Sequence, residues 1–341
     1  MTFKLYLWCL GIGVAFSLLN GCSHPSPKSE PPSKTENRTP LPRAQRKYKI
    51  AGVGFQDDQF FKLIEFGMKA AAEKNGVELS LGTSAGSLDK EIALVDAYIA
   101  QKVDALAIAP ISQKGSIAAL KRAHDSGIKV VTFDSHIEAD FPVSNIKSDQ
   151  VSLGKLTGEE AVRYIQERMG GKAKVAIITY MSLFPEAASQ RTQGFEEEVK
   201  KLPGVEIVAK QDAWIASAAV DVVEQVLAAH PEVNLIWAAN EGGTVGAVTA
   251  VKNSGKAGKI VVFGTDISEQ MADFLLSDDD ILQAVTGQKP FDIGVRAIET
   301  ALNALEGERV EKKVRLPGVL FTRREKDKVK QYKDYLHDLT R

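Results

Sequence analysis

Residues 48–55 (YKIAGVGF) and 60–74 (FFKLIEFGMKAAAEK) decide the fold of this chain. The first run is almost continuously apolar over the length of a short strand, which is typical of a strand buried on both faces. In the second run, Phe60, Leu63 and Ile64 begin an apolar pattern that recurs at helical spacing. The pair therefore predicts a buried strand followed by an amphipathic helix.

The same alternation continues along most of the chain. Further strands are expected at 77–81, 105–108, 129–133, 143–146, 174–179, 206–210, 235–239 and 259–263. Helices are expected between them, at 88–101, 114–126, 151–168, 187–201, 218–229, 244–253 and 269–276. Parallel strands need long crossovers, which bury both faces of the sheet. The order therefore predicts an α/β protein with two similar, doubly wound lobes of parallel strands.

The end of the chain departs from this regular order. Residues 314–321 (VRLPGVLF) predict a last strand, and Pro317 favours an edge or crossover position because proline cannot donate to a ladder. Residues 323–339 predict a charged helix. Its apolar residues favour a solvated helix packed on the domain over a helix that binds a partner, and they are Val329, Tyr332, Leu336 and Leu339.

Composition excludes several classes of function. Of the 341 residues 44% are hydrophobic, and 43 Lys and Arg balance 44 Asp and Glu, so a globular protein with no nucleic-acid partner is expected. The length suits two domains once a targeting segment is removed. The two cysteines, Cys9 and Cys22, form no disulfide framework or thiolate site, and the five histidines lack ligand spacing, so no metal is expected.

The N-terminus carries a predicted export signal. Residues 5–19 (LYLWCLGIGVAFSLL) are apolar but too short to span a bilayer comfortably as a helix. Residues 19–22 (LNGC) then resemble the bacterial lipobox, which implies a signal peptide at 1–21 and lipidation of Cys22. The alternatives are a signal peptide with an incidental cysteine and an uncleaved membrane anchor.

The segment that follows favours lipidation. Residues 22–46 are rich in Pro, Ser and charge, with few apolar residues, so a disordered tether is expected. A tether is what a lipid anchor needs to hold a domain clear of the membrane. We therefore expect an exported protein of the cell envelope, anchored through lipid on Cys22 at the periplasmic or extracellular face.

Five short sequences, taken together, resemble the periplasmic sugar-binding proteins of the ribose and galactose type, whose fold is shared by LacI-like effector domains. They are FQDDQFF at 55–61, GIKVVTFD at 127–134, RTQGF at 191–195, AANE at 238–241 and GTD at 264–266. The resemblance implies two lobes joined by a hinge of three crossovers, the type I periplasmic binding protein fold, with the ligand between them. Open α/β sheets also bind ligands at the carboxyl ends of their strands, where these sequences lie.

The resemblance assigns residues to each lobe. We expect the N-terminal lobe at 47–147 plus 289–316 and the C-terminal lobe at 148–288. The last strand and charged helix take 317–341. The protein is expected to be a monomer.

A sugar offers apolar faces that pack on aromatic rings and a belt of hydroxyls that need polar partners. The matching aromatic positions are Phe60, Phe61 and Trp214. The matching polar positions are Asp58, Asp134, Ser135, Arg191, Asn240, Asp266 and Gln288. Some of these positions also have a purely structural alternative. Phe61 could be a core residue and Asp58 a helix N-cap, and Asp134 and Asp266 could be turn residues.

One position departs from the family. In ribose receptors the aspartate matching Asp134 is followed by an arginine, whereas this chain has Ser135 and then His136, which puts D-ribose in doubt. Asp58, Asp134, Asp266 and Glu241 outnumber Arg191 in the expected cleft, which favours a neutral sugar or polyol over an anionic ligand.

The resemblance implies a solute-binding protein that delivers its ligand to the permease of an ABC importer. The alternative is a sensory module for a histidine kinase or chemoreceptor, without transport. Gly52-Val53-Gly54 lacks the third glycine of a dinucleotide loop, and no GxSxG or Walker pattern occurs, so neither an enzyme nor a cofactor is expected. An export signal stands where a LacI-type repressor has its helix-turn-helix.

Overall fold

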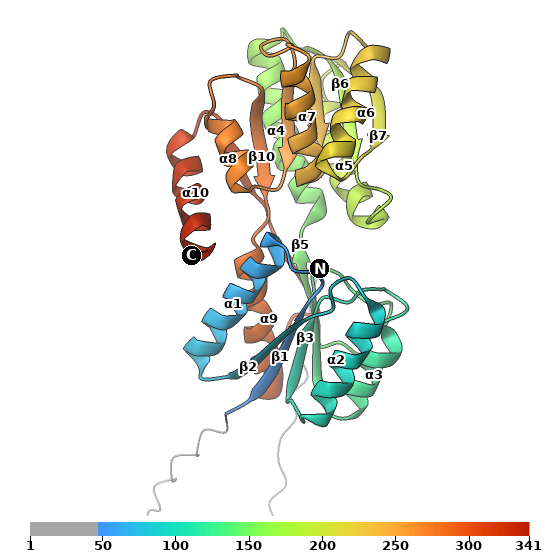
Figure 1. The fold of residues 1–341 in the computed structure, drawn as a ribbon, viewed down its shortest axis with the longest axis vertical. Helices are drawn as coiled ribbons and strands as arrows, with labels where there is room; N and C mark the ends of the chain where they lie inside the picture. The colour runs from blue at the N-terminus through green and yellow to red at the C-terminus, as the bar shows by residue number, and fades with distance from the viewer. Residues whose placement is uncertain (1–46, 341) are drawn as a thin grey trace, which may run out of the picture. The chain divides into compact units, whose positions relative to one another are not determined.

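The computed structural model describes residues 47–340 (Figure 1). The predicted signal peptide (1–21), the lipidation site Cys22 and the predicted tether (22–46) lie outside the described residues, so they stay predictions.

The first sheet has six strands in the order β11-β5-β4-β3-β1-β2, and every neighbouring pair is parallel. The strands are β1 (Lys49–Gly54), β2 (Glu78–Thr83), β3 (Ala105–Ile108), β4 (Lys129–Phe133), β5 (Ser144–Ser148) and β11 (Lys313–Leu316). Two helices cover each face, so the core lies in two layers. The first pair is α1 (Gln59–Asn75) with α9 (Pro290–Leu305), and the second is α2 (Leu88–Ala100) with α3 (Ile117–Asp125).

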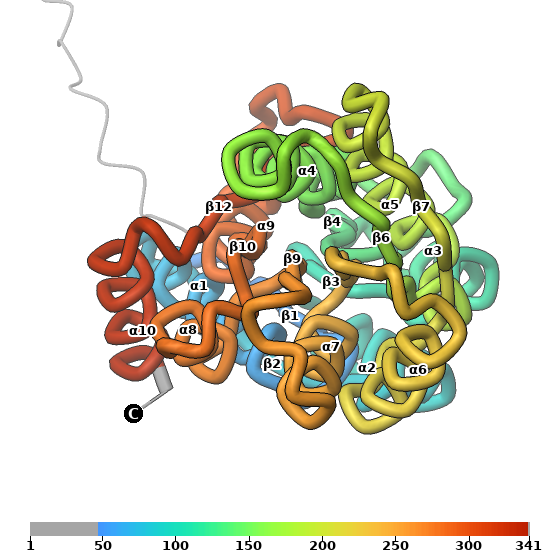
Figure 2. The backbone as a smooth tube through the Cα atoms, turned by 90° about the horizontal axis from the view of Figure 1, so that it is seen from above, coloured from blue at the N-terminus to red at the C-terminus, as the bar shows by residue number. Residues whose placement is uncertain are grey.

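The second sheet repeats this plan, in the order β12-β10-β9-β8-β6-β7 (Figures 1 and 2). Its strands are β6 (Lys172–Thr179), β7 (Gly204–Asp212), β8 (Leu235–Ala238), β9 (Val261–Thr265), β10 (Leu282–Gly287) and β12 (Val319–Thr322). On one face lie α4 (Gln150–Arg168) and α5 (Pro185–Val199). On the other lie α6 (Ala216–Ala229), α7 (Glu241–Asn253), α8 (Glu269–Leu276) and α10 (Lys326–Thr340).

Three parts of the sequence prediction need correction. The single strand expected at 314–321 is two strands, because the chain leaves the first sheet after β11 and joins the second as β12. β12 runs antiparallel to β10, so the second sheet is not wholly parallel. β10 and α9 were not predicted; in β10 the buried polar residues Gln283 and Thr286 interrupt the apolar run.

The chain passes between the two sheets three times, after β5, after β10 and after β11. These passages are the three crossovers of the expected hinge. β12 and α10 belong to the second lobe, because β12 pairs with β10 and Val329 and Phe321 share its core. The residue limits of the lobes stay a prediction.

Close packing against α4 fixes the middle of α5. A Cβ on Gly154 of α4 would come within 1.8 Å of the Arg191 carbonyl oxygen, and one on Gly194 of α5 within 2.1 Å of the Val151 carbonyl oxygen. The two backbones therefore meet directly. This contact fixes the position of the Arg191 backbone relative to α4.

The charged C-terminal helix is packed on the domain, the interpretation that its apolar pattern favours. Val329 and Leu336 of α10 are fully buried, and the Tyr332 ring lies 4.6 Å from that of Phe321. Within residues 47–340, no helix is both long and apolar enough to cross a membrane. The same residues hold no group of three or more His, Cys, Asp or Glu side chains placed to bind a metal ion.

Candidate ligand-binding cleft

The site lies at the switch point of each sheet, where the direction in which successive strands are added reverses. β1 is flanked by β2 on one side and β3 on the other, and β6 is flanked likewise by β7 and β8. At such switch points the loops after neighbouring strands diverge and leave a crevice at their carboxyl ends. A cavity of about 630 Å³ is lined by loops from both sheets. Its volume is within the usual range for small-molecule sites.

Nine of the ten predicted ligand-binding residues line this cavity. They are Asp58, Phe60, Phe61, Asp134, Ser135, Arg191, Asn240, Asp266 and Gln288. The tenth, Trp214, is not among the lining residues; its side chain is 40% exposed, and its carbonyl oxygen accepts a hydrogen bond of 2.9 Å from the Asn240 amide. The indole therefore does not face the cavity in this structure.

Two aspartates occupy equivalent places in the two lobes. Asp134 follows β4 with φ of 58°, and Asp266 follows β9 with φ of 73°. Residues other than glycine rarely adopt this left-handed conformation, and such strain gathers at functional sites. The conformation agrees with the alternative that these are turn residues, and the turn aims both carboxyl groups at the cavity.

Asp266 has partners within its own lobe. It accepts hydrogen bonds from the Glu241 backbone N–H at 3.0 Å and from the Gln288 amide at 2.8 Å. The Arg191 guanidinium lies 3.8 Å away. That guanidinium also donates to Gln150 Oε1 at 2.6 and 2.9 Å and to the Ala239 carbonyl oxygen at 2.6 Å. Most of its donors are therefore used before any ligand arrives.

Asp134 has a different environment. Burial raises its pKa to about 6, and Asp58 and Asp266 act in the same direction, while Arg191 and Lys147 oppose the shift. A carboxyl group in this state binds a hydrogen-bond donor strongly once one is supplied. A ligand that donates a hydrogen bond to Asp134 therefore stabilises its ionised form.

Two helices begin at the cavity with a polar cap. Asp58 caps α1, accepting from the Phe61 backbone N–H at 2.9 Å, and Asn240 caps α7, accepting from the Gly243 backbone N–H at 3.1 Å. Asp58 is therefore a helix N-cap, as the alternative interpretation of the sequence held. Both side chains still line the cavity. The caps hold them in place there.

Aromatic residues line the cavity from both lobes. Phe61 is only 5% exposed and belongs to the core of the first lobe, and Phe60 packs edge-on against it at 5.4 Å. Phe184, which precedes α5 in the second lobe, lies 6.2 Å from Phe55 of the first. Phe184 is 40% exposed and lines the cavity, although no sequence pattern marked it.

Gln288 and Ser135 form hydrogen bonds within the protein that stabilise the cleft. Gln288 accepts a hydrogen bond of 2.7 Å from Ser148, so it joins two of the crossovers. The Ser135 hydroxyl donates to the Pro110 carbonyl oxygen at 2.5 Å. The Ser135 proton is therefore committed to the backbone.

The sequence analysis missed several polar lining residues, and three of them bear on the chemistry of the cleft. Lys147 lies near the end of β5, Tyr180 directly after β6, and Glu186 in the first turn of α5. Lys147 and Tyr180 each lie at the carboxyl end of a strand, which is the signal that could have found them. Glu186 had no such signal, because it comes from a helix.

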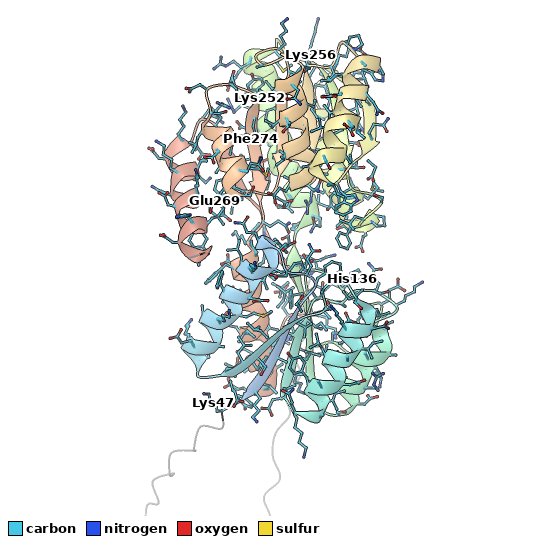
Figure 3. All side chains as sticks on the ribbon, in the orientation of Figure 1. Lys47, His136, Lys252, Lys256, Glu269 and Phe274 are labelled. Atoms are coloured by element: carbon cyan, nitrogen blue, oxygen red, sulfur yellow. The ribbon has the colours of Figure 1, made fainter. Side chains whose placement is uncertain are left out.

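Glu186 joins the two lobes. The Lys147 ammonium lies 3.8 Å from one of its oxygens and His136 Nε2 lies 3.9 Å from the other, and Gln113 donates at 3.4 Å. Figure 3 shows His136 at the edge of the first lobe that faces the second. Partial burial opposes the shift, but Lys147 and His136 lower the pKa of Glu186.

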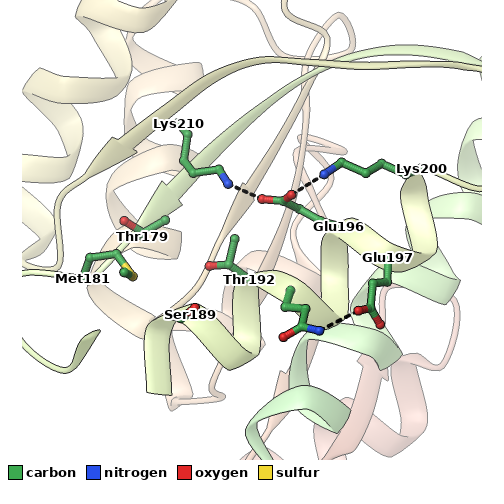
Figure 4. A pocket seen from close by; sticks show the side chains of 9 residues that line it. Thr179, Met181, Ser189, Thr192, Glu196, Glu197, Lys200 and Lys210 are labelled. Carbon is green, nitrogen blue, oxygen red and sulfur yellow. Dashed lines mark hydrogen bonds and ion pairs between the residues drawn. The ribbon is translucent and has the colours of Figure 1, made fainter. Parts of the chain in front are cut away.

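A second cavity of about 490 Å³ lies within the second lobe, beside α5 and β7 (Figure 4). Its charged residues pair with one another: Glu196 binds both Lys200 and Lys210, and Gln193 donates to Glu197 at 2.7 Å. These contacts leave little unpaired polarity for a ligand.

The fold and the cleft define a two-lobed solute-binding protein. Residues 53–309, well over half of the chain, match the family described as periplasmic binding protein domain, and the chain belongs to this family. Members of the family bind solutes and are not enzymes. The resemblance noted in the sequence is thereby confirmed.

Individual relatives point the same way. The chain is 30% identical over 298 residues to the ABC transporter periplasmic-binding protein YphF of Escherichia coli K12, covering 84% of this chain and 89% of that one. It is 29% identical over 310 residues to the ribose import binding protein RbsB of Bacillus subtilis 168, covering 90% and 95%. A solute-binding protein from Actinobacillus succinogenes 130z, crystallised with D-allose, matches with TM-score 0.74 and 27% identity, covering 84% of this chain and 100% of that one.

Proposed function

We propose that this protein captures a neutral sugar or polyol in the interlobe cleft and delivers it to an ABC importer. The observation that carries the proposal is the composition of the cleft. Five carboxyl groups line it, from Asp58, Asp134, Glu186, Glu241 and Asp266, against the basic side chains of Lys147 and Arg191. Such a lining repels phosphorylated and carboxylated ligands and suits hydroxyl groups, which donate to carboxylates.

The ten predicted residues are the proposed ligand contacts, with Phe60 and Phe61 against one face of the ring. Trp214 is proposed to reach the other face when the lobes close on the ligand, because its loop is joined to the cleft through Asn240. Hinge closure of two lobes around a ligand is a common transition of binding proteins. The closed form is the one proposed to dock on the permease.

Import is preferred to sensing because the relatives are named for transport or import. The proposal includes the lobe limits given above, the monomeric state, and attachment to the membrane through lipid on Cys22. Intact-mass spectrometry of the protein purified from membranes tests the last point. A Cys22→Ser variant should lose both the added lipid mass and the membrane fraction.

The central test is a binding panel. Full-length protein, purified in detergent, should bind at least one aldopentose, aldohexose or inositol by titration calorimetry, and it should not bind sugar phosphates or sugar acids. Preference for an anionic sugar, or no binding across the panel, would contradict the proposal.

A further inference from the structure

Among the described residues, two polar groups of the cleft lack an adequate partner. The Tyr180 hydroxyl is buried and has no hydrogen-bond partner among the described residues. The Tyr180 side chain is 5% exposed and lines the cavity. A buried hydroxyl without a hydrogen bond costs free energy, so such groups are rare unless a ligand or water satisfies them.

Lys147 is the second such group. Its side chain is 11% exposed, and its nearest carboxylate oxygen, on Glu186, lies 3.8 Å away, beyond hydrogen-bond range. Burial lowers the pKa of Lys147, with Glu186 and Asp134 opposing the shift. An ammonium carries three donors, and an ion pair of this length satisfies them poorly.

Lys147 lies beside Asp134, and Tyr180 lines the same cavity. Phe133 pairs with Ile146 in the register between β4 and β5, and the Asp134 backbone N–H donates to the Ile146 carbonyl oxygen at 2.9 Å. The next residues along the two strands, Asp134 and Lys147, therefore lie side by side. Tyr180 comes from the opposite lobe, where its ring lies 5.1 Å from the Arg191 guanidinium.

We propose that Lys147 and Tyr180 bind ligand hydroxyls beside Asp134, Lys147 from the first lobe and Tyr180 from the second. This inference rests on the proposed function and specifies the ligand further. A hydroxyl next to Asp134 donates its proton to the carboxylate and accepts from the ammonium, so both partners are satisfied at once. The cleft then selects ligands with free hydroxyls at this place and rejects their deoxy analogues.

Ser135 and Arg191 do not supply the hydrogen-bond donor that a ligand hydroxyl beside Asp134 needs. The Ser135 proton is committed to the Pro110 carbonyl oxygen. Arg191 donates to Gln150 and Ala239 and lies beside Asp266. Among the lining residues, the cation Lys147 has its nearest carboxylate oxygen 3.8 Å away, and it stands next to Asp134.

The test compares conservative variants with matched controls. Lys147→Met keeps the stem of the side chain and removes the charge, and Tyr180→Phe removes only the hydroxyl. The controls are Lys114→Met, at a lysine whose exposed side chain pairs with Glu138 at 3.7 Å, and Tyr335→Phe, at an exposed tyrosine of α10. Neither control residue is among those lining the cavity.

Each full-length variant is titrated with the panel sugar that the unaltered protein binds most tightly, and with its monodeoxy analogues. Lys147→Met should weaken binding at least tenfold and Tyr180→Phe about fivefold, as expected for lost hydrogen bonds to a charged and a neutral group. The controls should stay within twofold, and the melting temperature without ligand should not fall. One deoxy analogue should bind weakly to the unaltered protein and lose little more in Lys147→Met.

Three results would overturn the inference. The first is binding by both variants within twofold of the unaltered protein. The second is an equal loss in Glu186→Gln, which would show that Lys147 acts only through its interlobe ion pair. The third is no binding of any panel sugar by the unaltered protein. That last result removes the proposed function as well, whereas the first two leave it standing.

Discussion

The two lobes place an aspartate at the same point of the same fold and then treat it differently. Asp266 of the second lobe accepts two hydrogen bonds and lies 3.8 Å from Arg191. Asp134 of the first lobe has its pKa raised to about 6, chiefly by burial. One lobe thus holds a carboxylate that is already satisfied, and the other holds one that gains most from a ligand. A repeated fold therefore fixes where a residue lies and leaves its electrostatics to its neighbours.

The largest effect is expected at Arg191, which lies beside the hydrogen-bonded aspartate Asp266 of the second lobe. Arg191→Met should lower the free energy of unfolding by about 3 kcal/mol, because it leaves Gln150, the Ala239 carbonyl and Asp266 without their buried partner. Denaturant unfolding of the ligand-free protein measures this. A change below about 1 kcal/mol would mean that the guanidinium is not a structural support.

The next effect contrasts the two aspartates directly. At pH 7, Asp266→Asn should destabilise the ligand-free protein by about 2 kcal/mol because it removes the charge beside buried Arg191. Asp134→Asn should stabilise it by about 2 kcal/mol. The pKa shift from 3.8 to about 6 corresponds to about 3 kcal/mol, at about 1.4 kcal/mol per pKa unit, and the cost of burying the amide offsets part of this. Chemical denaturation of both variants measures the difference. An equal change in the free energy of unfolding of the two variants would contradict the proposed difference between Asp134 and Asp266.

The sign of the Asp134 effect also depends on pH. Its folded pKa of about 6 lies above the ordinary value of 3.8, so the native state holds the proton more tightly than the unfolded chain. Stability from this group is fully present below pH 4 and is lost as pH rises to about 6. The advantage of Asp134→Asn should therefore vanish at pH 4 and reach its full size at pH 7.

Ligand affinity should change with pH in the opposite direction. A sugar hydroxyl that donates to the ionised Asp134 stabilises that form, so affinity should fall as the group takes up a proton, by about tenfold between pH 7 and pH 5. Titration calorimetry at several pH values measures this. In Asp134→Asn the affinity should be nearly constant over the same range, and a parallel fall in that variant would assign the effect to another group.

The smallest expected effect concerns the aromatic walls. Phe60 already lines the cavity in the first lobe, whereas Trp214 of the second does not. Trp214→Ala should weaken binding by about 1 kcal/mol if the ring stacks on the sugar in the closed form. The unfolding free energy should change little, since the side chain is 40% exposed. Unchanged affinity would remove Trp214 from the site.

Much of the fold was predictable because helix and strand periodicity are local. The strand at 48–55 and the helix at 60–74 appear as β1 and α1 with only their ends shifted. β10 was missed because Gln283 and Thr286 are polar and yet buried. Their burial depends on neighbouring strands, which a local pattern does not contain.

The site follows the same division. The sequence by itself determined the α/β alternation and the polar residues after β4 and β9, because these depend on residue order and on the rule that ligands bind at strand ends. The tertiary structure alone decided that Glu186 joins them from a helix, that Trp214 does not line the cavity, and that burial raises the pKa of Asp134 to about 6. Proton affinity and access to a cavity arise from contacts between distant segments, and only folding brings those segments together.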